Sequence, residues 1–418
     1  MPDTPIRAKL QAFIASVLPG LFLIGYVIGT GSVTSMAKAG ASHGMSLTWT
    51  LALASLFTHI MVVALSRLTI LSGETTLFTF RRHFGRPVTL FILASLMTTQ
   101  IASIIGVMGI MTDVFREWTS QWAGGAGVPP LASAVAFTLL LLGLYWQGRH
   151  ALFLKALAGL VAMMGVAFVF TATIVMPDPE TMLRGLVPSV PKTGDPALLI
   201  AAMVGTTMAS VVLITRSVLV QEKGWTARDF SEVNRDSGFA MSALFFINAA
   251  IMACAAGTLY VQGMEIDRAI DMVKTLEPLA GRVAVTGFVL GILAAGLSSL
   301  FPNYVLGPWM ICDYLGIPRR MDRTGFRVLV ALTALTGLVV PIFGGSPVQI
   351  MIASQAVSPL VMPLLALFVW VLINKPEIAA KHPPSRALNV GMAVTVLFST
   401  YMLILAVRGF IEQFGFAA

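Results

Sequence analysis

The sequence contains few of the groups on which soluble proteins and metal-binding domains depend. Charged residues make up only 11% of its 418 residues, against roughly 25% in an ordinary soluble domain. Its two cysteines, Cys254 and Cys312, are too few for a disulfide framework and lack metal-ligand spacing. We therefore interpret both as packing residues. The sequence contains neither a recognisable nucleophile–base pair nor a nucleotide-binding loop, so we expect no enzyme activity.

Apolar residues, by contrast, are abundant. They form 57% of the chain, more than a soluble core can absorb, so most of them must face lipid or neighbouring helices. A transmembrane helix requires about 20 mostly apolar residues, and the alternating pattern of a barrel strand is absent. The sequence predicts eleven spans at 12–37, 47–69, 87–112, 128–147, 153–176, 197–220, 237–260, 282–310, 326–344, 348–373 and 388–409.

The basic residues predict how the chain is oriented. The formal charge of +8 is spread over short loops instead of one patch, which argues against nucleic acid. Arginines and lysines gather in alternate loops, as at 81–86, 223–235, 319–327 and 375–386. By the positive-inside rule, this places the N-terminus in the cytoplasm and the C-terminus outside. We expect an inner-membrane protein with no removable signal peptide.

Two spans are interrupted at corresponding places. Near mid-depth, the first span carries the small and hydroxyl residues of 29–32, and the sixth carries those of 205–210. Such residues disfavour continuous helix. Interrupted helices at equivalent positions of two halves are typical of alternating-access transporters and mark their substrate site. The alternative is that small residues simply let the helices pack closely.

Several strings resemble the Nramp family of divalent-metal transporters, in the right order over nearly the whole chain. They include Ser72-Gly73-Glu74 after the second span, Leu183-Arg184-Gly185 before the sixth, and residues 246–250, 293–299 and 353–355. The resemblance implies an all-α membrane protein with a LeuT-like fold and a 5+5 inverted repeat. The single transmembrane domain 1–418 would then comprise repeats 12–176 and 197–373 and an eleventh helix at 388–409.

The metal-binding motifs of that family are missing from this sequence. Its Asp-Pro-Gly-Asn motif corresponds here to Gly29, Thr30, Gly31 and Ser32, and its Met-Pro-His-Asn motif to residues 209–212. A second family histidine corresponds to Arg216, and acidic positions associated with a proton route correspond to Leu93, Gln100 and Ser103. Among the polar site residues only Gln355 matches.

The residues themselves favour an anion as substrate. The central stretches of the spans contain no Asp or Glu, whereas a divalent cation usually requires carboxylate, imidazole or sulfur ligands. Half-helix N-termini bind anions through unpaired N–H groups and the helix dipole. We therefore predict a substrate site formed by Gly29, Thr30, Gly31, Ser32, Ala209, Ser210, Val211 and Gln355. The alternative is that the hydroxyls cap their own half-helices.

Three further ionisable residues lie near this site. Lys38 and Arg216 each follow an interruption by six residues, about 9 Å along a helix. We expect them to attract anions in the two vestibules, unless they extend to the lipid headgroups as interface residues. His59 is either a proton relay or a hydrogen-bonded packing residue.

We thus predict a secondary transporter of a small anion, most specifically bicarbonate, coupled to Na⁺ held at unwound helices. One alternative is a carrier of Mn²⁺ or Mg²⁺ in which carbonyl groups hold a hydrated ion. The other is a non-transporting sensor. We expect an inorganic ion and the lipid bilayer as partners, with no nucleic acid and no obligatory protein partner.

Overall fold

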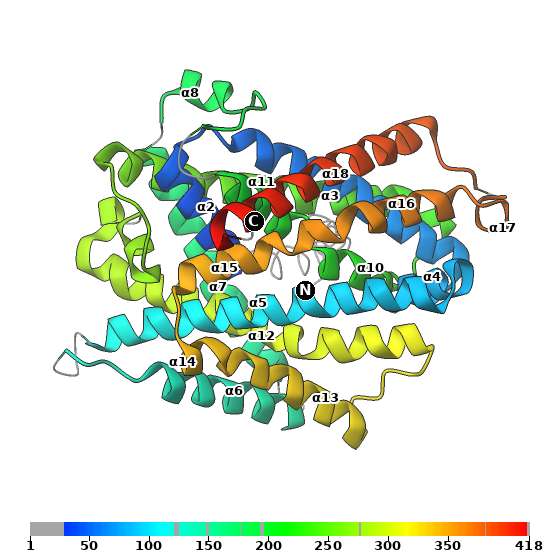
Figure 1. The fold of residues 1–418 in the computed structure, drawn as a ribbon, viewed down its shortest axis with the longest axis horizontal. Helices are drawn as coiled ribbons and strands as arrows, with labels where there is room; N and C mark the ends of the chain where they lie inside the picture. The colour runs from blue at the N-terminus through cyan, green and yellow to red at the C-terminus, as the bar shows by residue number, and fades with distance from the viewer. Residues whose placement is uncertain are drawn as a thin grey trace, which may run out of the picture.

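The computed structural model describes residues 29–120, 125–147, 150–175, 177–192, 196–275, 277–380 and 382–415, and all regular secondary structure within them is helical (Figure 1). Nine helical segments of this part are long and apolar enough to cross a membrane. Part of α7 (His150–Ile174) forms a shorter apolar helix at Gly159–Ile174. Of the predicted first span, only α2 (Thr30–His43) lies inside the described residues. The predicted all-α membrane fold is confirmed.

Each remaining predicted span corresponds to an observed helical segment. In chain order these are α3 (Thr48–Ser72), α5 (Arg86–Ser120), α6 (Pro130–Gln147), α7, α9 with α10 (Pro196–Thr207 and Ser210–Lys223), α11 (Phe230–Thr258), α12 (Glu277–Leu315), α13 to α14 (Thr324–Leu335 and Val339–Phe343), α15 with α16 (Pro347–Ala356 and Met362–Ile373) and α18 (Arg386–Phe414). Short helices α4 (Thr76–Phe84), α8 (Pro179–Arg184) and α17 (Pro376–Ala379) lie in the connections.

The predicted interruption of the sixth span is confirmed. Helix α9 ends at Thr207 and α10 begins at Ser210, with Ala209 extended between them. In the first span, α2 begins at Thr30 after the extended Gly29, whereas the half preceding this residue lies outside the described residues. A third break was not predicted. The span at 348–373 is divided by a 3₁₀ turn, η5 (Ser358–Leu360), between α15 and α16.

The broken helices form the centre of the protein. Every residue of α9 is buried, as are most residues of α2 and α10. Helix α2 packs against α9, α11 and α15, while α9 also packs against α15 and α18. Small residues permit these close approaches: a Cβ on Gly40 of α2 would lie 2.3 Å from the backbone oxygen of Met252 on α11. The broken segments are therefore enclosed by the continuous helices.

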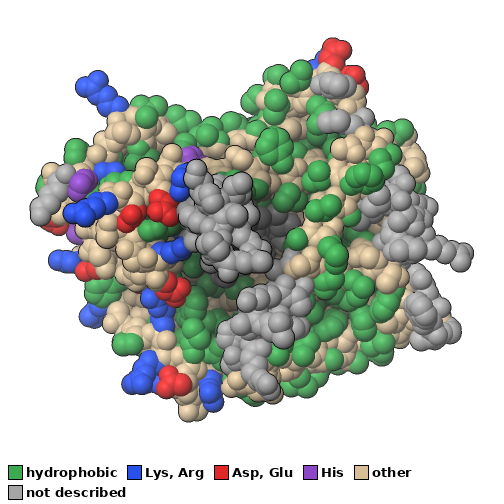
Figure 2. Space-filling model, turned by 180° about the vertical axis from the view of Figure 1, so that it is seen from behind, with side chains coloured by type: hydrophobic (Ala, Val, Ile, Leu, Met, Phe, Trp, Pro, Cys, Tyr) green, Lys and Arg blue, Asp and Glu red, His purple; other side chains and the backbone are tan. Residues whose placement is uncertain are grey.

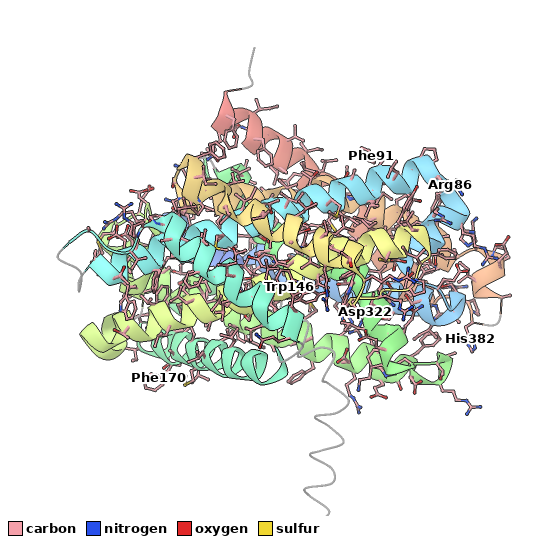
Figure 3. The ribbon with its side chains drawn as sticks, turned by 90° about the horizontal axis from the view of Figure 1, so that it is seen from below. Arg86, Phe91, Trp146, Phe170, Asp322 and His382 are labelled. Atoms are coloured by element: carbon pink, nitrogen blue, oxygen red, sulfur yellow. The ribbon has the colours of Figure 1, made fainter. Side chains whose placement is uncertain are left out.

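The surface is divided as a membrane protein requires. Figure 2 shows Lys, Arg, Asp, Glu and His side chains gathered toward one end, with apolar side chains over the middle. Figure 3 shows Arg86 and His382 toward that end, while Phe91 and Phe170 lie on the flanks. These two phenylalanines are 63% and 56% exposed. Because so large an apolar surface is unfavourable in water, the flanks face lipid.

Candidate functional site

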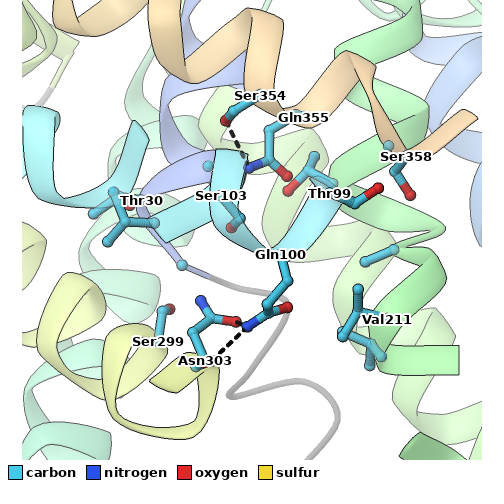
Figure 4. Close-up of a pocket in the computed structure, with 17 residues that line it drawn as sticks. Thr30, Thr99, Gln100, Ser103, Val211, Ser299, Asn303, Ser354, Gln355 and Ser358 are labelled. Atoms are coloured by element: carbon cyan, nitrogen blue, oxygen red, sulfur yellow. Dashed lines mark hydrogen bonds between the residues drawn. The ribbon is translucent and has the colours of Figure 1, made fainter. Parts of the chain in front are cut away.

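A cavity of about 50 Å³ lies where the broken helices meet (Figure 4). One water molecule requires roughly 10–15 Å³ of such space, so the cavity has room for an ion with part of its hydration shell. It is lined by Gly29, Thr30, Gly31, Thr99, Gln100, Ser103, Val107, Gly205, Thr206, Ala209, Val211, Val212, Ser299, Asn303, Ser354, Gln355 and Ser358. None of these residues is charged.

The structure brings together six of the eight predicted site residues. Gly29, Thr30, Gly31, Ala209, Val211 and Gln355 line the cavity. The other two, Ser32 and Ser210, do not line it and take part in hydrogen bonds between helices. The hydroxyl of Ser32 lies 3.0 Å from that of Thr206 on α9, and the hydroxyl of Ser210 lies 3.1 Å from that of Ser358.

Sequence reasoning missed the contribution of α5 and α12 to the site. Gln100 donates from Nε2 to the side-chain oxygen of Asn303 at 2.6 Å and to its backbone oxygen at 2.8 Å. Both side chains are buried. An amide near the middle of each of two apolar spans was the available signal, because a buried amide requires partners. The sequence did not show that the two amides meet.

Three neutral oxygen atoms are available in the cavity. The hydroxyls of Thr30 and Ser299 are buried and have no hydrogen-bond partner in the described part of the chain. Gln355 donates from Nε2 to Ser354 Oγ and Met351 Sδ at 3.5 and 3.6 Å. Its oxygen atom points toward Thr99 in Figure 4. Buried polar groups are normally paired, so the two hydroxyls without a partner indicate a place for a polar ligand.

Two glycines position the Gln355 side chain and backbone. A Cβ on Gly31 would lie 3.0 Å from both the amide carbon and the amide nitrogen of Gln355. A Cβ on Gly205 would lie 1.9 Å from the backbone oxygen of the same residue. We expected Gly31 to let an anion approach the backbone, but its missing side chain instead makes room for this amide. Close packing, the alternative interpretation, therefore accounts for Gly31.

The predicted vestibule charges are neutralised. Lys38 Nζ lies 3.0 Å from a carboxylate oxygen of Glu265 and 3.9 Å from one of Asp267. Arg216 is fully buried and pairs with Asp236 at 2.8 Å. Because each of these cations is already paired with a carboxylate, neither is free to attract an anion in the arrangement observed. The three carboxylates, of Glu265, Asp267 and Asp236, lie outside the spans predicted from hydropathy.

The N-terminus of α10 is also already occupied. The backbone N–H of Ser210 donates to the hydroxyl of Ser358 at 2.9 Å. One of the donors that would have received an anion is therefore used by a side chain from η5. Neither α2 nor α10 has a side-chain cap from its own N-cap residue, so hydroxyl capping within the half-helices is not observed either.

The remaining candidates have packing roles. His59 Nδ1 lies 3.0 Å from the hydroxyl of Ser237, as expected for a hydrogen-bonded packing histidine. Cys254 and Cys312 are free and buried. Within the described residues, no cluster of three or more His, Cys, Asp or Glu could hold a metal.

The family model described as natural resistance-associated macrophage protein-like (Nramp) matches residues 20–409. The divalent metal cation transporter MntH of Erwinia tasmaniensis is 29% identical over 410 residues, covering 94% of this chain and 93% of that protein. MntH of Klebsiella pneumoniae strain 342 is 31% identical over 365 residues, covering 84% and 83%.

Solved structures show the same fold. A mutant of the Eremococcus coleocola manganese transporter gives a TM-score of 0.76 at 15% identity, covering all of this chain and 91% of that one. The nucleobase-cation-symport-1 family transporter MHP1 gives 0.57 at 14% identity, covering 94% and 90%. The predicted LeuT-like fold is confirmed.

These relatives overturn the prediction of bicarbonate transport. Their names describe carriers of divalent metal cations, and the cations expected to favour an anion here are paired. We predicted an anion because the spans contain no carboxylate ligands. That argument did not consider the hydroxyl and amide oxygens of the cavity as ligands for a cation. Divalent-cation transport, the first alternative, fits better.

Proposed function

Because this chain belongs to the Nramp family, we propose that it is a secondary transporter of a hydrated, hard divalent cation, Mg²⁺ or Mn²⁺. The cation binds in the central cavity between α2, α10 and α15 and reaches either side of the membrane by alternating access. The proposal rests chiefly on one observation: among the described residues that line the cavity, all uncharged, the hydroxyls of Thr30 and Ser299 are buried without a hydrogen-bond partner, and the side chain of Gln355 lines the same cavity.

The donor types favour a cation that retains water. Hydroxyl and amide oxygens are hard ligands, which suit Mg²⁺ and Mn²⁺ better than softer metals. Mg²⁺ gives up its water reluctantly and usually keeps several molecules. A cavity of about 50 Å³ accommodates a few waters, so a partly hydrated ion avoids the cost of complete dehydration without a carboxylate. The described lining includes no His, Cys or Met to select a softer ion.

The membrane potential supplies a driving force for such an ion. With a neutral site, the loaded protein carries two additional positive charges across the membrane. Each elementary charge contributes about 2.3 kcal/mol per 100 mV, so a divalent ion gains about twice that amount. Entry into a negatively charged cell is then favourable without a second ion. A requirement for Na⁺ remains a prediction and is tested in the same assay.

The charge distribution supports an orientation. Arg81 donates to the backbone oxygen of Tyr314 at the end of α12, and the hydroxyl of Tyr314 donates to the backbone oxygen of Arg86, so these arginines lie at the same end of the molecule as the arginine-rich α12–α13 connection. By the positive-inside rule, this end faces the cytoplasm. The N-terminus is then cytoplasmic and the C-terminus external, in a plasma or inner membrane.

The test is flux into proteoliposomes that contain the purified full-length chain and a dye responsive to divalent ions. We expect uptake of Mg²⁺ or Mn²⁺ above that of empty liposomes, and competition between the two ions. Replacement of external Na⁺ by choline shows whether uptake of the divalent ion requires Na⁺. Absence of uptake for every divalent ion, in a preparation that elutes as a single species, would refute the proposal.

A further inference from the structure

An apolar groove opens between α5, α12 and α13, away from the central cavity. It has a volume of about 250 Å³ and is lined by Met97, Ile101, Pro308, Ile311, Leu329, Leu332, Thr333 and Thr336. The two threonine hydroxyls donate to the backbone oxygens of Leu329 and Thr333, at 2.8 and 2.7 Å. They therefore offer no free donor to water, and a groove of this kind favours an apolar occupant.

The two groove walls formed by α12 and α13 are joined by the α12–α13 connection, which is rich in arginine. Helix α12 ends at Leu315, four residues beyond Ile311, and Arg319 follows in the connection to α13. On the other wall, Arg327 precedes Leu329 by two residues, about 3 Å along the helix. Between 316 and 327 the chain contains four arginines and one aspartate, a net charge of +3 (four minus one).

Little of this positive charge is neutralised by the protein. Among the described residues, Arg320 forms an ion pair with Asp322 at 3.8 Å. The other three arginines form no ion pair with a described carboxylate. A guanidinium nitrogen of Arg319 is buried without a hydrogen-bond partner. Nearby Asp313 accepts hydrogen bonds from the hydroxyl of Thr75 and the backbone N–H of Leu77, and its carboxylate interacts with Arg319 by charge alone, without an ion pair.

The connection is held in place beside α6. The hydroxyl of Tyr145 donates to the backbone oxygen of Met321 at 3.3 Å, and Figure 3 shows Asp322 beside Trp146. Because the connection is anchored, its arginines remain near the open end of the groove.

We propose that this groove, with Arg319, Arg323 and Arg327, is a binding site for an anionic phospholipid. One acyl chain lies along the apolar walls, and the phosphate of the headgroup contacts the arginines. Basic pockets between transmembrane helices are suited to anionic headgroups, and planar guanidinium groups bind phosphate oxygens in pairs. The occupant is a lipid and not free phosphate, because the charge cluster and the apolar groove are continuous.

The experiment is native mass spectrometry of the full-length protein in detergent with equal amounts of palmitoyl-oleoyl phosphatidylglycerol and the corresponding phosphatidylcholine. We expect one phosphatidylglycerol to be retained in preference to phosphatidylcholine. In the variant Arg319→Gln/Arg323→Gln/Arg327→Gln, the preference should fall by at least about tenfold. The variant Arg228→Gln/Arg235→Gln/Arg386→Gln removes the same charge from exposed positions on other helices and should retain the preference.

The groove is tested separately from the charges. Thr336→Phe fills it without changing any charge and should also abolish retention, whereas excess glycerol phosphate should not displace the bound lipid. Equal retention of both lipids by the wild type, or equal losses in the two triple variants, would overturn the proposal. Because Arg323 and Arg327 are exposed, the double variant at these positions is available if the triple variant does not fold.

Discussion

Arg216 on α10 and Asp236 on α11 form an ion pair of 2.8 Å in which neither side chain has exposed surface. Arg216 also donates to the hydroxyl of Ser66 on α3 at 3.0 Å, and its guanidinium carbon lies 5.1 Å from the centre of the Trp225 ring. One side chain thus joins the second half of the sixth span to two neighbouring helices.

Breaking this pair on one side should destabilise the protein severely. Asp236→Leu leaves the arginine buried without its counter-ion, which typically costs about 3–5 kcal/mol. The double variant Arg216→Met/Asp236→Leu removes both charges and should recover most of the loss. The measurement is the midpoint of thermal unfolding in detergent for both variants. A single variant as stable as the wild type would show that the pair does not hold α10 in place.

Thr30 should contribute directly to cation binding. Thr30→Val removes one of the unpartnered oxygens while keeping the shape of the side chain. The apparent KM for the transported divalent ion should rise about two- to tenfold, the effect of losing one neutral polar contact. Thr34→Val is the matched control, because Thr34 also has a buried hydroxyl without a partner but does not line the cavity. Equal KM values for the two variants would contradict this role.

Gly205 should tolerate no side chain. In Gly205→Ala the new Cβ would lie 1.9 Å from the backbone oxygen of Gln355, so α9 and α15 must separate. Overpacking of this kind typically costs about 1–3 kcal/mol, and the displacement of Gln355 should also reduce uptake. Gly143→Ala on α6 is the control, because nothing lies within 4 Å of its Cβ position. Thermal unfolding midpoints and initial uptake rates should therefore decline in the first variant only.

Uptake should depend on voltage. Since none of the described residues that line the cavity is charged, the proposed mechanism has the loaded protein carry the full charge of the ion. An inside-negative potassium diffusion potential, set with valinomycin, should therefore accelerate Mg²⁺ or Mn²⁺ uptake into proteoliposomes. Uptake that is unchanged between zero and negative potential would indicate that compensating charge moves with the ion.

His83 on α4, outside the membrane-spanning segments, should make stability depend on pH. Burial lowers the pKa of His83, and the charge of Lys375 lowers this pKa further; the two nitrogen atoms are 3.3 Å apart. Because the folded protein disfavours protonation, stability should be complete above the unfolded pKa of about 6.5 and decrease as pH falls through the lower folded pKa. Unfolding midpoints across this range should vary less in His83→Gln than in the wild type.

The helices and two interruptions could be predicted from the sequence because each depends on local composition. Apolar runs of the right length predicted the spans, and residues 29–32 and 205–210 predicted the positions at which α2 and α10 begin. The break at η5 was missed, although Pro359 and Pro363 inside the apolar run at 348–373 were a signal for it.

The electrostatics of the site could not be predicted in the same way. Asp236 lies one residue outside the predicted span at 237–260, so the carboxylate that neutralises Arg216 was not counted as buried. The meeting of Gln100 and Asn303 depends on how α5 packs against α12, which hydropathy does not report. Local patterns identified where the chain is interrupted, whereas the charge balance depended on contacts between distant segments.

The close approach of Gly205 to the backbone of Gln355 links two parts of the transport cycle. No side chain separates the first half of the sixth span from the first half of the tenth, and the hydroxyl of Ser358 is bonded to the N–H that opens α10. A change in the tilt of one segment should therefore move the other, and with it the Gln355 amide that lines the proposed cation site. If the proposed site is correct, the geometry of ion binding is thus coupled to the position of the sixth span.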